Sequence, residues 1–220
     1  MVIGITGNFG AGKTTVAKML KRLGARIIDA DQIAHAIIKP YGPVYKQIIA
    51  SFGRQVCVGV YISRKRLAEI AFSNKKQLSK LNKIMHPKIL KIIKNRIRKF
   101  STHQIIVVDA ALLIESGLSS SHASRRIYGR YTGVKSLLPW IDKLIVVKSK
   151  RNIQLQRLKE KGLTDAVIER RINAQLSEAK KVSFSDFVID NSGPRNKTQK
   201  QVKEIWNKII INREGRRWKR

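Results

Sequence analysis

The sequence has few cysteines and histidines, and their positions do not match a protein metal centre. Its 220 residues include one cysteine, Cys57, so neither an intramolecular disulfide nor a cysteine-rich zinc site can form. The four histidines are scattered without the spacing of metal ligands. We therefore expect no metal centre built from these two residue types.

The sequence also lacks a long hydrophobic run. The best candidate, residues 105–114, is about half the ~20 residues needed to span a bilayer, and it contains Asp109. The first ten residues, MVIGITGNFG, lack the positive charges of a signal peptide and soon become glycine-rich. These absences predict a soluble, cytoplasmic protein without membrane contact.

Acidic residues are scarce: 14 Asp and Glu face 46 Lys and Arg, for a net charge of +32. Residues 70–108 contain no acid, and further cations gather at the C-terminal end. Such a charge attracts polyanions, from phosphorylated small molecules to nucleic acid. Two interpretations stay open here, namely compositional bias around a small anionic ligand or contact with nucleic acid.

Short apolar runs alternate with helical patterns, which is typical of an α/β fold with a parallel sheet. Residues 53–63 are expected to form a loop or short hairpin, and His86-Pro87 should break or kink a helix. The expected strands are 2–6, 26–28, 105–108, 144–147 and 187–189. The expected helices are 14–23, most of 32–100, much of 150–182, and 195–211.

The most specific motif is GNFGAGKT at residues 7–14, which fits G-x-x-x-x-G-K-[ST] between a predicted strand and a predicted helix. In such a loop the backbone amides converge on phosphate oxygens at a helix N-terminus. Lys13 would reach the β- and γ-phosphates, and the Thr14 hydroxyl would bind Mg²⁺. The motif therefore predicts binding of a nucleoside triphosphate.

Three carboxylates follow predicted strands, at the edge where open α/β sheets bind ligands. Asp109 ends the run IIVVD and is either a Walker-B-like Mg²⁺ residue or a simple strand-end carboxylate. Asp29 and Asp31 either cap the next helix or act beside the triphosphate. There, a carboxylate that accepts the proton of an acceptor hydroxyl would serve a phosphoryl transferase.

Cations on the predicted helices 150–176 and the His86-Pro87 pair have two interpretations each. Arg157, Lys161 and Arg171 are either solvated or fold over phosphates to stabilise transition-state charge. His86 either belongs to a plain helix break or lies at a functional site.

Seven segments together resemble the dephospho-CoA kinase family over nearly the whole chain. They are, in order, GITGNFGAGKTTVA, IIDADQIAH, SRKRLAEIAFSN, LNKIMHP, VVDAALLIESGL, RINAQLSEAKK and FVIDNSG. The resemblance implies transfer of the ATP γ-phosphate to the ribose 3′-hydroxyl of dephospho-CoA, giving CoA and ADP in the last step of coenzyme A biosynthesis. It also implies ATP and Mg²⁺ as cofactors.

The resemblance further implies a P-loop NTPase-type three-layer fold with a parallel sheet, an inserted helical substrate domain and a helical lid. The core would be residues 1–31, 101–150 and 183–220, the helical CoA-side domain 32–100, and the lid 151–182. The matching positions imply an ATP-binding loop of Gly10, Ala11, Gly12, Lys13, Thr14 and Thr15. They imply a catalytic set of Asp31 as general base with Lys13, Arg157 and Arg171, substrate contacts at Asp29 and His86, and Mg²⁺ at Thr14 and Asp109.

Three positions depart from the family pattern. Ala111 stands where the family usually has proline, and Lys161 where it commonly has a lid arginine with a planar fork. Relative to the family pattern, about twenty residues are added between Gly117 and Pro139, and this insert is basic and carries Tyr128 and Tyr131. This insert is either a tolerated surface loop or a contact for a polyanion or the substrate.

Two other functions remain open from the residues alone. One is a P-loop kinase for another small acceptor, such as a nucleoside or nucleotide. The other is a nucleic-acid-binding P-loop NTPase, which the charge suggests although no binding module is recognisable. A monomer or a small homo-oligomer is expected.

Overall fold

The computed structural model describes residues 1–100, 103–111 and 140–217, without the side chains of 75 and 212–217. The basic insert, with Tyr128 and Tyr131, lies outside the described residues. No helix in the described part of the chain is long and apolar enough to cross a membrane.

A five-stranded parallel sheet forms the centre of the fold, in the order β2-β5-β1-β6-β7. All four neighbouring pairs are parallel, which confirms the predicted sheet. β1 is buried along its whole length, because the central strands of such a sheet are covered on both faces. The strands are β1 (Val2–Gly7), β2 (Arg26–Asp29), β5 (Ile106–Asp109), β6 (Lys143–Lys148) and β7 (Phe187–Asp190).

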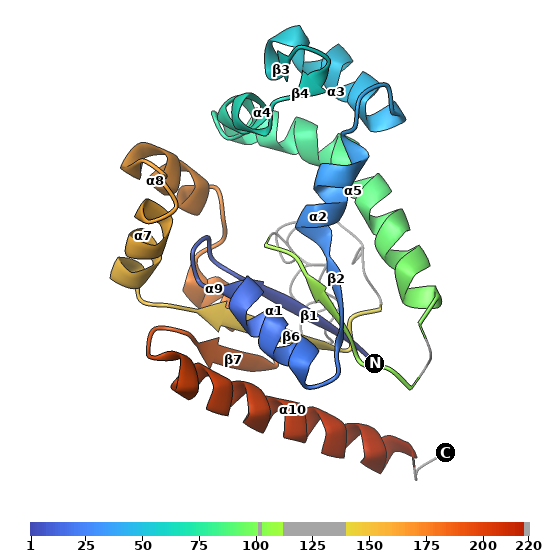
Figure 1. The fold of residues 1–220 in the computed structure, drawn as a ribbon, viewed down its shortest axis with the longest axis vertical. Coiled ribbons are helices and arrows are strands. Elements are labelled where there is room, and N and C mark those ends of the chain that lie inside the picture. The colour runs from blue at the N-terminus through green and yellow to red at the C-terminus, as the bar shows by residue number, and fades with distance from the viewer. Residues whose placement is uncertain (101–102, 112–139, 218–220) are drawn as a thin grey trace.

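Alternate strand residues point to opposite faces and build two separate cores, which makes the fold three-layered. On one face Ile3 and Ile5 pack with α1 (Lys13–Arg22) and α10 (Arg195–Arg217). On the other face Val2 and Val108 pack with α2 (Ala30–Ile37) and α5 (Lys75–Arg98). Figure 1 shows α10 running beneath the sheet edge at β7.

Residues 30–100, called the helical segment below, form a third hydrophobic cluster beside these two cores. The segment contains α2, α3 (Pro43–Phe52), η1 (Arg54–Val56), α4 (Arg64–Ala71) and α5. Strands β3 (Cys57–Val58) and β4 (Tyr61–Ile62) pair antiparallel, so the hairpin expected in 53–63 is confirmed. Figure 1 shows α3, α4 and the hairpin standing clear of the sheet, at the end where α2 leaves β2.

α5 is continuous from Lys75 to Arg98 with Pro87 inside it, so of the two outcomes predicted for His86-Pro87, a break or a kink, the break is wrong. Proline removes one hydrogen bond, but packing on both sides of Pro87 holds the helix. Met85 and Leu81 pack against the cluster of the helical segment, while Ile89 and Ile93 are buried against the sheet.

Three shorter helices follow β6: α7 (Arg151–Lys159), α8 (Asp165–Asn173) and α9 (Glu178–Val182). In Figure 1, α7 and α8 project beyond the sheet at the same end as the helical segment. This places them near the loop between β1 and α1. The division into core, substrate domain and lid stays an interpretation of this arrangement.

Candidate active site

The loop between β1 and α1 packs so tightly against the ends of β6 and β7 that two of its glycines cannot be replaced without a clash. A Cβ at Gly7 would lie 2.1 Å from the carbonyl oxygen of Val147, and one at Gly12 would lie 2.0 Å from Asn191 Nδ2. Gly12 also has a φ of 90°, in the left-handed region, where it begins α1. The loop therefore ends at a helix N-terminus whose first amides have no intrahelical partner.

Lys13, the first residue of α1, folds back over this loop. Its Nζ donates hydrogen bonds to the carbonyl oxygens of Gly7 at 3.0 Å and Asn8 at 3.3 Å. Its charge also lowers the pKa values of Asp31 and Asp109, against the larger effect of burial. The cation thus lies between the loop and the carboxylates at the ends of β2 and β5.

Asn191, just after β7, supports the loop from behind. Its buried side-chain amide donates to the carbonyl oxygen of Ala11 at 2.9 Å and accepts from the Thr198 hydroxyl at 3.0 Å. A buried amide satisfied on both sides holds one orientation, so the loop carbonyl is fixed with it.

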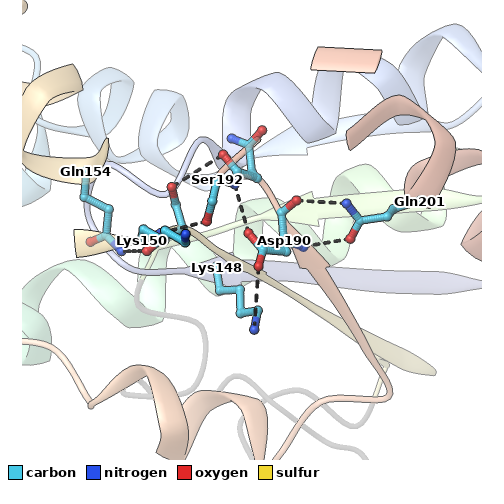
Figure 2. A network of polar contacts seen from close by, with 8 residues as sticks. Lys148, Lys150, Gln154, Asp190, Ser192 and Gln201 are labelled. Carbon is cyan, nitrogen blue, oxygen red and sulfur yellow. Dashed lines mark hydrogen bonds and ion pairs between the residues drawn. The ribbon is translucent and has the colours of Figure 1, made fainter. Parts of the chain in front are cut away.

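The polar network in Figure 2 holds the loop that carries Asn191 in place. Gln201 exchanges two hydrogen bonds of 2.9 Å with the Asp190 backbone. The Asp190 carboxylate accepts from the Ser192 amide, and the Ser192 hydroxyl accepts from the Lys150 amide. Hydrogen bonding from Ser192 lowers the pKa of Asp190, so this carboxylate stays ionised.

Asp29, Asp31 and Asp109 lie close enough for their charges to affect one another's pKa values. Burial raises the pKa of Asp109 to about 6, and the charges of Asp31 and Asp29 add to the rise. Asp31 keeps an exposed side chain, but the surrounding protein excludes enough water to raise its pKa, with a further rise from Asp29. Asp29 itself caps α2, because its Oδ1 accepts a 2.8 Å hydrogen bond from the Gln32 amide.

Magnesium suits this donor set. Mg²⁺ is usually held by one or two carboxylates together with phosphates and waters rather than by an all-protein cage. No described residues form a group of three or more His, Cys, Asp or Glu that could hold a metal ion. Asp109 is a buried carboxylate whose pKa is raised mainly by burial, so a bound cation would stabilise its ionised form, and Thr14 offers an exposed hydroxyl on α1.

Both arginines predicted from the helices after β6 lie at the loop. Arg157 on α7 donates to the Asn191 carbonyl oxygen at 2.9 Å, and its Nη1 would lie 3.5 Å from a Cβ at Gly12. The Arg171 guanidinium on α8 lies 5.1 Å from the centre of the Phe9 ring. Gln175 accepts a 2.8 Å hydrogen bond from the Phe9 amide.

The remaining residues singled out from the sequence are His86, Lys161 and Ala111. His86 is half-buried on α5, the helix that packs against α2, and burial lowers its pKa so that the ring is neutral at pH 7. Lys161 is exposed just beyond the end of α7. Ala111 follows β5, and its carbonyl oxygen accepts a 3.1 Å hydrogen bond from the Thr6 hydroxyl, which ties this turn to β1.

A sequence model of the dephospho-CoA kinase family matches residues 1–127 and 134–197. The chain belongs to the dephospho-CoA kinase family. Two relatives that carry this name, from Aquifex aeolicus and Geobacillus kaustophilus, are each 35% identical to it. The alignments cover 94% and 93% of this chain and 96% and 94% of those proteins, so the similarity extends over whole chains.

Solved structures confirm the fold of this family member. TT1252 from Thermus thermophilus has a TM-score of 0.74 at 23% identity, covering 94% of this chain and 97% of that one. Dephospho-CoA kinase from Campylobacter jejuni has a TM-score of 0.62 at 23% identity, covering 96% and 98%. A deoxyadenosine kinase from M. mycoides reaches 0.52 at 18% identity, so the fold alone does not identify the acceptor.

Sequence reasoning missed several residues that the structure brings to the site. Asn191 was visible only as part of the segment FVIDNSG, and no role followed from it. Phe9 occupies a variable position of the loop motif, and Phe72 lies at the end of α4. Nothing in their spacing indicates that both rings face Arg171.

Proposed function

We propose that this protein transfers the γ-phosphate of ATP to the ribose 3′-hydroxyl of dephospho-CoA, giving CoA and ADP. The membership of the family across the whole chain carries the choice of acceptor. The loop, its lysine and the strand-end carboxylates supply the parts that phosphoryl transfer needs.

Lys13 and the loop amides would hold the β- and γ-phosphates, while Thr14 and Asp109 would hold Mg²⁺. The bound ion would neutralise charge on the phosphate oxygens. Arg157 and Arg171 would add positive charge over the transferring group, and they would exclude water as a competing acceptor.

Asp31 is proposed as the general base that accepts the proton of the 3′-hydroxyl. Its raised pKa supports this role, because a base is most effective when its pKa approaches the working pH. The charge of Lys13 opposes the rise in the pKa of Asp31 and favours the ionised carboxylate that a base needs. Asp29, which caps the same helix, and His86 on α5 would contact the substrate from the side of the helical segment.

The test measures CoA and ADP formation with ATP, Mg²⁺ and dephospho-CoA, beside adenosine and AMP as rival acceptors. We expect dephospho-CoA to be the only one of these three acceptors that is phosphorylated. Asp31→Asn should lower kcat by about 100-fold or more while the Kd for ATP changes less than twofold. Retained turnover in this variant would remove Asp31 from the role of base, and turnover with AMP or adenosine would reassign the acceptor.

Location and assembly complete the proposal. A cytoplasmic enzyme that acts as a monomer or small homo-oligomer is expected, and nucleic-acid contact is not required for its chemistry. Stimulation of ATP hydrolysis by RNA, in the absence of dephospho-CoA, would favour the nucleic-acid-binding alternative that the charge of +32 suggests.

A further inference from the structure

The Arg171 guanidinium contacts two aromatic rings that belong to different parts of the fold. Its Cζ lies 5.1 Å from the centre of the Phe9 ring in the phosphate loop. It lies 6.0 Å from the centre of the Phe72 ring, at the residue that ends α4 in the helical segment. Both distances are within the range of a cation–π interaction.

These contacts connect three elements of the fold. Arg171 comes from α8, Phe9 from the loop between β1 and α1, and Phe72 from the helical segment. The Phe9 amide also donates to Gln175 Oε1 at 2.8 Å, so the chain after α8 is tied to the same loop residue. In Figure 1, α8 and α4 both lie beyond the end of the sheet where the loop between β1 and α1 is found.

Charge and burial make the ring contacts significant. Arg171 is half-buried, and this partial burial lowers its pKa, although a guanidinium remains charged at any working pH. No carboxylate among the described residues forms a salt bridge with it. The faces of the two rings, which carry partial negative charge, are therefore electrostatic partners of this cation within the described structure.

We propose that Phe9 and Phe72 are positioning residues that hold the Arg171 guanidinium at the phosphate loop and couple its placement to the helical segment. This inference rests on the proposed function, in which Arg171 stabilises the transferring phosphate. The loop ring fixes the arginine near the triphosphate, and Phe72 makes its position depend on the segment expected to receive the acceptor.

The test compares substitutions that keep or remove the aromatic face. Phe72→Leu should lower kcat about fivefold and change the KM for ATP less than twofold, because the arginine is misplaced while the loop is intact. Phe72→Tyr keeps the ring face and should retain at least half of the wild-type kcat. Phe100→Leu is the matched control, since Phe100 is also half-buried but packs against the sheet core, and kcat should not change.

A second background separates positioning from general loss of structure. In Arg171→Gln, which removes the cation, Phe72→Leu should cause no further fall in kcat. The same fivefold fall in both backgrounds, or an equal fall in Phe72→Tyr, would overturn the proposal. If Phe72→Leu does not fold, Phe9→Leu tests the other ring contact of Arg171, from the loop side, with the same expected loss of kcat that disappears in the Arg171→Gln background.

Hydrogen exchange provides a readout that does not depend on catalysis. Amides of α8 should exchange at least threefold faster in Phe72→Leu than in wild type or Phe100→Leu, because α8 loses a tether. Unchanged exchange would overturn the inference. Absence of CoA formation by the wild-type protein would contradict the proposed function, while the exchange result would still decide the role of the two rings.

Discussion

Asp109 is 9% exposed at the end of β5, and its burial raises its pKa to about 6. An unfolded aspartate has a pKa near 3.9, so the folded protein binds more protons between about pH 4 and pH 6. Stability therefore falls as pH rises through this window. We predict that Asp109→Asn raises the free energy of unfolding of the ligand-free protein by about 2–3 kcal/mol at pH 7, measured by urea denaturation.

The same variant should show almost no gain below about pH 3, where the wild-type carboxyl is protonated in both states. It should also lose kinase activity, because Asn is a weaker Mg²⁺ ligand. Asp190→Asn is the control of opposite sign, since the Ser192 hydrogen bond lowers the pKa of Asp190 and its charge is stabilising above about pH 4. A destabilised Asp109→Asn at pH 7 would contradict this account of the site.

The loop after β7 connects three elements of the fold, because Asn191 links β7 to α10 and to the loop between β1 and α1. Asn191→Ala would leave the Ala11 carbonyl and the Thr198 hydroxyl buried without partners. We predict about a tenfold increase in the KM for ATP, measured by steady-state kinetics, since the loop loses its support. A KM for ATP within twofold of wild type would show that the loop is held by other contacts.

Thr198→Val is the matched variant for this prediction, because it removes the second hydrogen bond and leaves the Asn191–Ala11 contact in place. It should lower thermal stability, since Asn191 Oδ1 loses its partner in a buried site. Its KM for ATP should rise less than threefold. A larger rise than in Asn191→Ala would place the important contact at α10 instead of at the loop.

The elements themselves were largely predictable from local pattern. Apolar runs such as 144–147 are buried on both faces, so their sequence signal is strong and the predicted strand was confirmed. Of the break or kink predicted at Pro87, the break was wrong, because tertiary packing of α5 outweighs the local cost of proline. Arg171 was singled out, but its ring partners were not, since contacts between distant segments leave no periodicity.

Across the whole molecule, positive charge greatly exceeds the available acids. The described residues form four salt bridges, while the chain has 46 Lys and Arg against 14 Asp and Glu. Most cations therefore repel one another across the surface, and this repulsion destabilises the compact state. The same field raises the local concentration of anionic substrates near the site.

Salt should therefore act on stability and on substrate binding in opposite directions. Raising NaCl from about 0.05 to 0.5 M shortens the screening length from roughly 14 to 4 Å, so the Tm should rise by several degrees as repulsion is screened. The KM values for ATP and dephospho-CoA should increase at the same time, because screening weakens the attraction of both anions. Sucrose is the control, since it stabilises folded proteins without screening charge and should leave KM unchanged. If Tm falls with NaCl, attractive ion pairs contribute more to stability than repulsion among the excess cations costs, and this account of the charge of +32 would be contradicted.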